Sequence, residues 1–554
     1  MKNRINYLVI AGCAALITSC SGFLDSAPIT SLVDENFYKT EADAQKAVIA
    51  CYDGLQIVWS DGMAWPVAAD VMSDDCFGGT GNSDGFGYQL LDEFDLSRSP
   101  SDQDIYNQNW ILYFKALYRC NMLLSKMDQI KWSSTANRNR IEAETRFIRA
   151  DLLFDMVKMW GHIPLVTEPI LDGNYNLPQA DPKDVYKVIT DDLRFACDNA
   201  YLSGGEKWTK AWGAANDGRV TVYAAKSMLA RVYLFYTGYY EKDEATTLTE
   251  LGISKDQVIT QLEDVYETNS GHALVDSFPR LWPAACSYPN TADTLIGLST
   301  TYVGEGNSET VFAIKFNSTG NWTGNTDGYI GQKMLTMRSG CFTAGNGKIY
   351  GAEGWGGATV TKSCWDSFNA SDPRRKASII SVAGEGLSYS ATDQREYTGY
   401  FNKKYTSMAN PKTGKGFLAA QSLDFQINSY QDYLVIRYAD VLLMLSELKE
   451  DVSYLNEVRA RVFLTPLTAY SVEALRNERR WELAFEGIRY WDLLRYGQTY
   501  AASKLATTVT VNDGGVNETK SITADKFLTT KGLSQIPQTQ IDMSGDVLHQ
   551  NRGW

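Results

Sequence analysis

The stretch NERRWELAFEGIRYWDLLRYG (residues 477–497) combines four arginines and three glutamates with two tryptophans. Glu478, Glu482 and Glu486 follow one another at intervals of four residues, which places them on one side of a helix. A second stripe is apolar and should pack against adjoining helices; it is formed by Trp481, Ala484, Phe485, Ile488 and Trp491. This pattern predicts an amphipathic helix over residues 471–496.

Glutamates spaced in this way are compatible with a catalytic acid/base pair, a metal site or a structural role. Like charges four residues apart destabilise a helix by about 0.2–0.5 kcal/mol per pair, so the glutamates require cationic partners. Arg479, Arg489 or arginines of another helix, such as Arg437 and Arg459, can supply them. We therefore interpret the stretch as a buried or half-buried ion-pair helix of the scaffold.

Composition excludes several classes of protein. The 66 acidic residues outnumber the 52 basic ones and no basic stripe runs along the chain, which argues against nucleic acid as a partner. The three histidines, at positions 162, 272 and 549, are not brought together by any motif, and the nine cysteines contain no C-x-x-C pair. These features argue against triad hydrolases, zinc sites and disulfide frameworks. We predict neither a cofactor nor a bound metal.

The amino end has the features of a targeting segment. Lys2 and Arg4 precede a short apolar run, Tyr7 to Ile17, which is typical of a cleavable secretory signal over residues 1–19. Cys20 follows small residues and resembles the lipidated cysteine of bacterial lipoproteins. We expect Cys20 to carry the lipid anchor and residues 20–33 to form a tether.

Paired amphipathic helices and one loop-rich region make up the rest of the chain. Helical periodicity predicts helices over residues 34–59, 107–127, 141–160, 185–200, 221–240 and 433–463. Their small and aromatic residues resemble those of tetratricopeptide repeats. We expect the scaffold to comprise residues 34–270 and 430–554. Residues 271–429, rich in Gly, Asn, Ser and Thr, should form a ligand-binding region with short strands such as Val311–Phe316.

Four stretches resemble the SusD/RagB family of outer-membrane nutrient-binding lipoproteins of Bacteroidetes. They are Cys20 with the following FLDSAPIT; AETRFIRADLLFDMVKMWGHIPLV (143–166); VIRYADVLLMLSEL with LNEVRARV and the stretch 477–497; and the carboxy end with Ile536-Pro537, Ile541-Asp542, Gln550-Asn551 and Gly553-Trp554. They occur in the family's order and reach both ends of the chain.

The resemblance implies a mainly α fold, in which tetratricopeptide-like helix pairs form an α/α superhelix and a loop-rich face binds ligand. It also implies a noncatalytic glycan-binding lipoprotein of the outer membrane, facing the cell surface. Such a protein captures an oligosaccharide or polysaccharide and delivers it to a SusC-like TonB-dependent transporter. A peptide-binding member of the same family and a surface glycoside hydrolase are the alternatives.

Adjacent acids in a glycine-rich loop are the first candidates for ligand contact. Asp74 and Asp75 could hydrogen-bond sugar hydroxyls or stabilise their own loop. A glycosidase pair requires carboxyl groups that face each other across one bond, and neighbouring loop residues seldom do so. We therefore expect no catalytic role for these two acids.

Sugar binding needs flat apolar rings together with planar polar groups. Aromatic and polar side chains of this kind lie in or beside the two glycine-rich regions: Trp65, Phe77, Tyr88, Asn321, Trp322, Arg338 and Trp355. Any one of the aromatic residues could instead belong to the core. A polar, glycine-rich setting favours their exposure, so we predict these residues as candidate ligand contacts.

Overall fold

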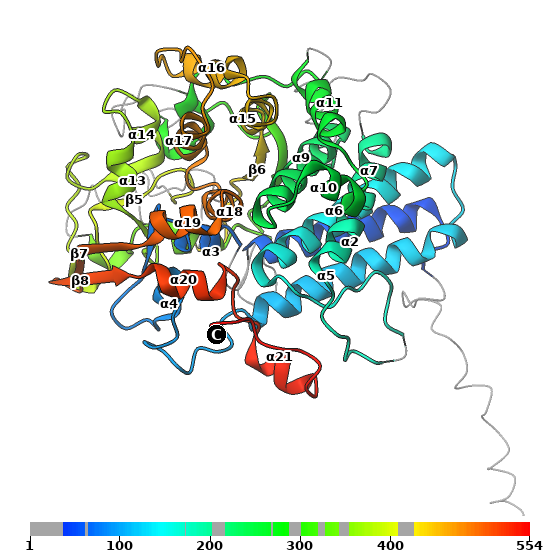
Figure 1. The fold of residues 1–554 in the computed structure, drawn as a ribbon, viewed down its shortest axis with the longest axis horizontal. Coiled ribbons are helices and arrows are strands. Elements are labelled where there is room, and N and C mark those ends of the chain that lie inside the picture. The colour runs from blue at the N-terminus through cyan, green and yellow to red at the C-terminus, as the bar shows by residue number, and fades with distance from the viewer. Residues whose placement is uncertain are drawn as a thin grey trace, which may run out of the picture.

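The computed structural model describes residues 37–60, 65–171, 173–201, 217–267, 270–286, 301–319, 327–342, 354–407 and 426–554. The predicted signal peptide, the tether with Cys20, and the candidates Asn321 and Trp322 lie outside these residues. Within the described part, long helices gather on one side of the molecule and short helices with paired strands on the other (Figure 1).

The scaffold is a succession of helices in which each packs against the next. Its longer members are α2 (Glu41–Ser60), α5 (Asn107–Lys126), α6 (Thr135–Trp160), α7 (Pro182–Asn199), α9 (Val222–Tyr239), α11 (Lys255–Tyr266) and α15 (Tyr438–Lys449). Contacts run in order from α2 through α5, α6, α7, α9 and α11 to α15 (Figure 1). The predicted mainly α, tetratricopeptide-like architecture is confirmed.

Shorter helices connect and cover this succession. They are α3 (Trp65–Val71), α4 (Gly87–Glu93), α10 (Glu244–Leu251), α12 (Gly331–Leu335), α13 (Lys362–Ser367), α14 (Pro373–Ser378), α16 (Val452–Arg461), α17 (Val472–Leu483), α18 (Arg489–Arg495), α19 (Gln498–Leu505), α20 (Ala524–Thr530) and α21 (Gln538–Met543). Single 3₁₀ turns occur at η1 (Met127–Gln129), η2 (Phe278–Leu281), η3 (Pro283–Ala285), η4 (Ser339–Cys341) and η6 (Ala391–Asp393).

The strands of the described residues form four antiparallel pairs. They are β1 (Cys76–Gly79) with β3 (Gly357–Val360), β2 (Thr310–Ile314) with β6 (Tyr433–Arg437), β4 (Ile379–Ser381) with β5 (Tyr400–Asn402), and β7 (Thr507–Asp513) with β8 (Val516–Ile522). Two pairs join the loop-rich region to other parts of the chain, since β1 and β6 lie outside residues 271–429. The loop-rich region is therefore fastened to the scaffold by backbone hydrogen bonds.

Local capping explains where several helices begin and end. The side chain of Ser134 accepts a hydrogen bond from the backbone N–H of Asn137, so α6 begins at Thr135, before the apolar pattern at Ile141. Gly161, with a φ of +69°, ends the helix as predicted. Thr221 caps α9 by the same kind of bond, to the N–H of Ala224.

Two expected helices are interrupted. Residues 433–463 begin with the strand β6 before α15 and α16 follow, because apolar Tyr433–Ile436 pairs with β2. The helix predicted over residues 471–496 is divided into α17 and α18. Phe485 and Gly487 between them have φ values of +63° and +66°, which a right-handed helix does not allow.

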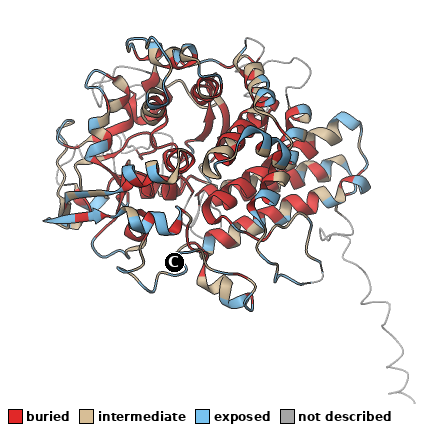
Figure 2. Cartoon of the chain, viewed as in Figure 1, coloured by how far each residue is buried: buried red, intermediate tan, exposed pale blue. Residues whose placement is uncertain are grey.

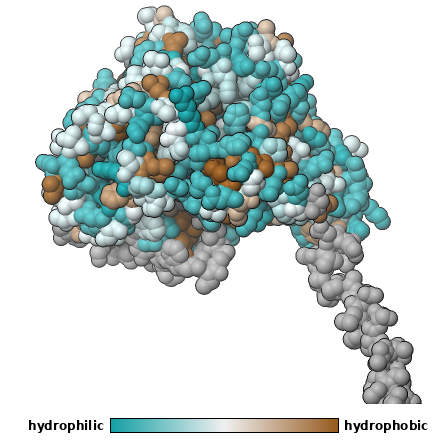
Figure 3. Space-filling view, turned by 60° about the horizontal axis from the view of Figure 1, so that its bottom comes forward, coloured by the Kyte–Doolittle hydropathy of each residue, from teal (hydrophilic) through white to brown (hydrophobic). Residues whose placement is uncertain are grey.

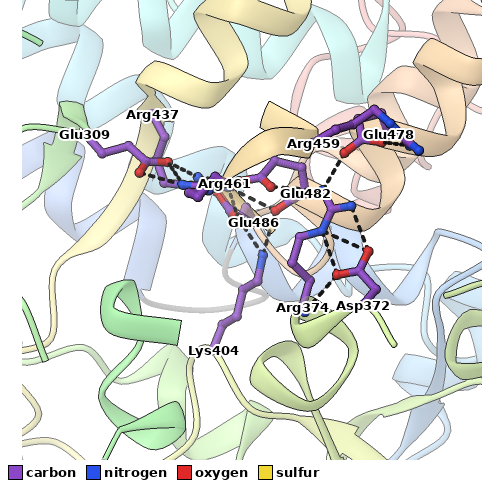
Figure 4. A network of polar contacts seen from close by, with 10 residues as sticks. All are labelled: Glu309, Asp372, Arg374, Lys404, Arg437, Arg459, Arg461, Glu478, Glu482 and Glu486. Atoms are coloured by element: carbon purple, nitrogen blue, oxygen red, sulfur yellow. Dashed lines mark hydrogen bonds and ion pairs between the residues drawn. The ribbon is translucent and has the colours of Figure 1, made fainter. Parts of the chain in front are cut away.

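The three glutamates of the opening stretch nevertheless lie together in a buried ionic network (Figure 4). Arg437 lies at its centre and donates hydrogen bonds to Glu486 at 2.7 Å and to Glu482 at 2.9 Å. Arg459 pairs with Glu478 at 2.9 Å. The predicted structural role, with Arg437 and Arg459 as partners, is confirmed.

Other members of this network come from distant parts of the chain. Arg374 pairs with Glu478 at 2.6 Å, and Lys404 donates to Glu486 at 2.6 Å (Figure 4). Two further cations expected as partners lie elsewhere: Arg479 pairs with Asp440 at 2.8 Å, and Arg489 with Asp74 at 2.7 Å. The break between α17 and α18 turns Arg489 away from the stripe of glutamates.

Burial follows the inner faces of the scaffold, while exposed residues lie on the outer turns and loops (Figure 2). The face shown in Figure 3 is largely hydrophilic, with hydrophobic residues in small separate groups. No helix among the described residues is long and apolar enough to cross a membrane.

Candidate ligand-binding cleft

An open cleft of about 880 Å³ lies among the loop after β1, the loop before α5, η4 and the segment before β3. Its lining combines charged and other polar groups with apolar surface and consists of Thr80, Asp84, Gly85, Gly87, Tyr88, Ser101, Asp102, Asp104, Ile105, Arg338, Ser339, Gly340, Gly354, Trp355, Asp393 and Gln426. Loops supported by a rigid scaffold are where binding residues usually lie. The volume suits a small-molecule or oligosaccharide ligand.

Trp355 supplies an aromatic surface to the cleft. Trp355 is 38% exposed, and the Nζ of the buried Lys333 lies 4.5 Å from the centroid of the indole ring. The backbone N–H of Trp355 donates to the carbonyl of Lys333 at 2.8 Å. On either side, a Cβ at Gly354 or Gly356 would come within 2.1 Å or 2.3 Å of a neighbouring oxygen. These glycines let the backbone approach closely and fix the position of the ring.

Arg338 forms the polar centre of the same wall. Its Nε donates to Asp393 at 2.7 Å and its Nη1 to Asp84 at 3.1 Å. The guanidinium lies over Gly81, where a Cβ would be only 2.0 Å from Cζ of Arg338. Partial burial acts to raise the pKa of Asp393, but the hydrogen bonds from Arg338 and the backbone of Asn82, together with the nearby guanidinium charges, hold the pKa below its ordinary value.

Other lining residues come from α4 and the loop before α5. Tyr88 is half-buried, and its hydroxyl donates to the sulfur of Met334 at 3.0 Å. The carboxylate of Asp104 accepts hydrogen bonds from the N–H and hydroxyl of Thr539, at 2.8 Å and 2.7 Å. The carboxy-terminal segment therefore fixes this loop in place.

The cleft brings together three of the residues predicted from sequence: Tyr88, Arg338 and Trp355. Four others belong to the packed interior or the ion pairs of the scaffold. Trp65 is 2% exposed and stacks on Trp491, with ring centroids 4.6 Å apart. Phe77 is 5% exposed and packs with Val511 and Ile522.

The adjacent aspartates are held by arginines of α17 and α18. Asp74 accepts hydrogen bonds from Arg489 at 2.7 Å and 2.9 Å, and Asp75 from Arg480 at 2.8 Å. Desolvation acts to raise the pKa of Asp74, but the two guanidinium groups lower it to about 2. Because Trp65, Asp74, Asp75 and Phe77 contribute to the scaffold in these ways, we leave them out of the candidate site.

Sequence reasoning missed the aspartates of the cleft. Asp84 lies in GNSDG (81–85), a composition that favours a turn, while Asp102, Asp104 and Asp393 lie in segments that carry no motif. A polar run directly before a predicted helix was the available signal for Asp102 and Asp104. Nothing local indicates that Asp393 meets Arg338.

The arrangement suits binding better than acid/base catalysis. A glycosidase pair requires one carboxyl group with a raised pKa to protonate the leaving group. Asp393 has the opposite shift, and both Asp393 and Asp84 are engaged by Arg338. An aromatic face beside planar polar groups is instead the combination that a sugar ring requires.

One acidic cluster elsewhere has the spacing of a metal site. Asp92, Glu93 and Glu396 offer oxygens within 4.8 Å of one another. The ammonium group of Lys520 lies among them, at 3.0, 2.9 and 2.5 Å. The lysine provides the positive charge that these three acids need, so the cluster is a buried ionic contact of the scaffold.

A second cleft, of about 620 Å³, lies beneath the β7–β8 hairpin and beside Arg480 and Lys504. Its aromatic lining residues, Phe77 and Tyr397, are buried and half-buried. The first cleft is therefore the better candidate, since it presents an exposed indole.

Helix pairs that support an open cleft of aromatic and polar loop residues define a ligand-binding protein on a tetratricopeptide-like scaffold. Two family profiles match the chain: "SusD family" over residues 308–554, and "Starch-binding associating with outer membrane" over residues 35–234. The chain belongs to the SusD/RagB family.

Curated relatives and solved structures agree with this assignment. The chain is 24% identical to a SusD-like protein of Bacteroides ovatus, over 90% of this chain and 83% of that protein, and 23% identical to SusD-like protein P25 of Formosa agariphila, over 86% and 87%. A laminarin binding SusD-like protein superposes with a TM-score of 0.70 at 26% identity, covering 93% of this chain and all of that one. Surface glycan-binding protein A from Bacteroides thetaiotaomicron, in complex with laminarihexaose, gives 0.69 at 21% identity, with the same coverage.

Proposed function

We propose that this protein is a noncatalytic glycan-binding lipoprotein that captures oligosaccharides in the cleft lined by Tyr88, Arg338 and Trp355. The observation that carries the proposal is the exposed indole of Trp355 beside the Arg338–Asp84–Asp393 group. The ring can stack on the C–H face of a sugar, while the guanidinium and carboxylates bond its hydroxyls. Two structural relatives that are named for laminarin or bound to laminarihexaose support the choice of glycan as ligand.

The proposal extends to location and partner. Cys20 would anchor the mature chain in the outer membrane, at the cell surface, and the captured oligosaccharide would pass to a SusC-like TonB-dependent transporter. The family description "associating with outer membrane" supports the location. The partnership would be tested by purifying the lipidated protein on an affinity tag and detecting the transporter in the eluate. The transporter should be absent from the eluate of cells that lack the lipoprotein.

The test of the binding site is calorimetry with a panel of neutral oligosaccharides that includes laminarihexaose. We expect Trp355→Ala to weaken the affinity for the panel member that binds by at least about fivefold, because stacking on an aromatic ring contributes on the order of 1 kcal/mol or more. Tyr175→Ala is the matched control, since Tyr175 is 72% exposed and does not line the cleft. Unchanged affinity in Trp355→Ala would place the binding site elsewhere.

Two further measurements separate the rival functions. Release of new reducing ends from a bound glycan would make the protein a glycoside hydrolase. Binding of a peptide pool, with no binding of any saccharide, would make it a peptide-binding member of the family. Asn321 and Trp322 stay predicted contacts, which alanine variants can test in the same assay.

A further inference from the structure

The charges that line the cleft are strongly unbalanced. Among the described residues that line it, four aspartates, at positions 84, 102, 104 and 393, face one cation, Arg338. Exposed aspartates are ionised at neutral pH. The lining therefore carries an excess of negative charge, in addition to the net charge of −14 of the whole chain.

Arg338, the cation that the described part of the lining contributes, is already engaged. Arg338 pairs with Asp393 at 2.7 Å and with Asp84 at 3.1 Å, so its charge is more than offset by its two partners. Two other cations lie behind the walls. Lys333 is buried beneath the ring of Trp355, and Arg395 is buried behind Phe86, 4.0 Å from its ring centroid. Neither of these two residues lines the cleft.

The other two carboxylates face the cleft without a cationic partner among the described residues. Asp104 is exposed and is bonded only to the N–H and hydroxyl of Thr539, which are neutral. Asp102 is half-exposed; its backbone carbonyl accepts from Gln535, and its side chain forms no ion pair. A ligand that enters the cleft therefore meets uncompensated negative charge on the side of the loop before α5.

We propose that the cleft selects uncharged saccharides and rejects polysaccharides that carry carboxylate or sulfate groups. The inference rests on the proposed function and names its substrate class. A cleft lined by one sign of charge concentrates its field, which lowers the local concentration of like-charged ligands. Rejection of this kind adds specificity without any contact to the preferred ligand. Hydroxyl groups of a neutral sugar can still donate hydrogen bonds to the same carboxylates.

The experiment compares ligands that differ only in charge. Each neutral oligosaccharide of the panel is paired with its C6-carboxylated form, and both are titrated by calorimetry at low and at physiological ionic strength. We expect the carboxylated form to bind at least about tenfold more weakly at low salt. The difference should shrink as salt rises, because screening acts within about 8 Å at physiological ionic strength.

A charge reversal within the cleft provides the second arm. Asp102→Lys should lower the ratio of the two dissociation constants, carboxylated to neutral, by about two- to tenfold, since exposed charges interact only modestly with one another. Asp128→Lys makes the same change in net charge at the far end of α5, about 30 Å away along a helix of 20 residues. This control should leave the ratio unchanged.

The outcomes are distinct. Equal or tighter binding of the carboxylated ligands, or an equal effect of Asp102→Lys and Asp128→Lys, would overturn the charge selection while leaving glycan binding intact. Binding of no saccharide, charged or neutral, would overturn the proposed function and the selection with it. A smaller penalty at high salt, together with the specific effect of Asp102→Lys, supports the inference.

Discussion

At the scale of single residues, the cleft depends on how closely Arg338 approaches the backbone. Its guanidinium bonds Asp84 and Asp393 while it lies over Gly81. Any side chain at position 81 would occupy the place of the guanidinium. The guanidinium of Arg338 can therefore take its position only because Gly81 has no Cβ.

Gly81→Ala should weaken oligosaccharide binding by about tenfold, because a hydrogen bond from a charged donor is worth about 1.5–3 kcal/mol. The free energy of unfolding should change by less than about 0.5 kcal/mol, since the end of a flexible side chain can move aside. Calorimetry and urea unfolding measure the two effects. In a double-mutant cycle with Arg338→Ala, the second substitution should add no further loss; additive losses would show that Gly81 acts independently of Arg338.

A second prediction at this scale concerns acid. Burial acts to raise the pKa of Asp440, but Arg231 and Arg479 lower it to about 2. A carboxyl group with a depressed pKa stabilises the fold above its unfolded pKa of about 3.9, and this stabilisation is lost as the pH falls from about 4 to 2. The contribution is about 2 kcal/mol.

Asp440→Asn should therefore cost about 3–5 kcal/mol at pH 7, where it breaks a buried pair, and less at pH 3. Urea unfolding at both pH values measures the difference. Asp191→Asn removes an exposed pair with Lys187 and should cost at most about 1 kcal/mol. An equal cost of Asp440→Asn at both pH values would contradict the linkage.

At the scale of elements, the break between α17 and α18 aims the side chains of the opening stretch. It lets Glu482 and Glu486 reach Arg437 while Arg489 turns to Asp74. Gly487 permits the break with its φ of +66°, and a Cβ there would lie 3.0 Å from Oη of Tyr433.

Gly487→Ala should lower the free energy of unfolding by about 1–2 kcal/mol, because a residue with a Cβ pays this cost in the left-handed region. Urea unfolding measures it. Gly85→Ala is the control for stability, since a Cβ at Gly85 has nothing within 4 Å. If both variants were equally stable, the strain assigned to the break would be absent.

Sequence patterns predicted the continuous helices well because their apolar periodicity and caps are local. They did not predict β6, since YLVIRYADVLLML (433–445) is one largely apolar run and only the pairing with β2 makes its first five residues, Tyr433–Arg437, a strand. The helix break at Gly487 was not predicted for a similar reason, because a single glycine in a helical pattern can either be tolerated or mark a break.

The sequence prediction agrees with the lining of the cleft only for residues that lie near glycine-rich loops and are also at least partly exposed. Trp355 lies between glycines and is exposed, whereas Trp65 lies near a similar loop and is buried against Trp491. From the sequence, Asp74 resembles a ligand contact. In the structure its carboxylate accepts a hydrogen bond from Arg489, which is remote in the sequence. Pairing between distant segments leaves no trace in a single sequence.

At the scale of the whole molecule, the proposed lipid anchor at Cys20 would decide where the binding face operates. If Cys20 carries the lipid, Cys20→Ala should release the exported protein from the outer membrane into the periplasm. Fractionation followed by immunodetection measures this change, and the affinity of the purified variant for oligosaccharide serves as its control for folding. Continued association of Cys20→Ala with the membrane would contradict lipid anchoring at this residue.

The walls of the cleft come from remote parts of the chain: the segment after β1, the loop before α5, η4, η6 and, through Thr539, the carboxy end. Contacts between segments so far apart in the sequence form slowly, because the chain loses loop-closure entropy before these contacts stabilise the fold. During export and folding, the scaffold helices can therefore assemble before any saccharide is recognised. Recovery of saccharide binding would then report the completion of folding. A chain that lacked its last residues would keep its helical content but would not bind the saccharide.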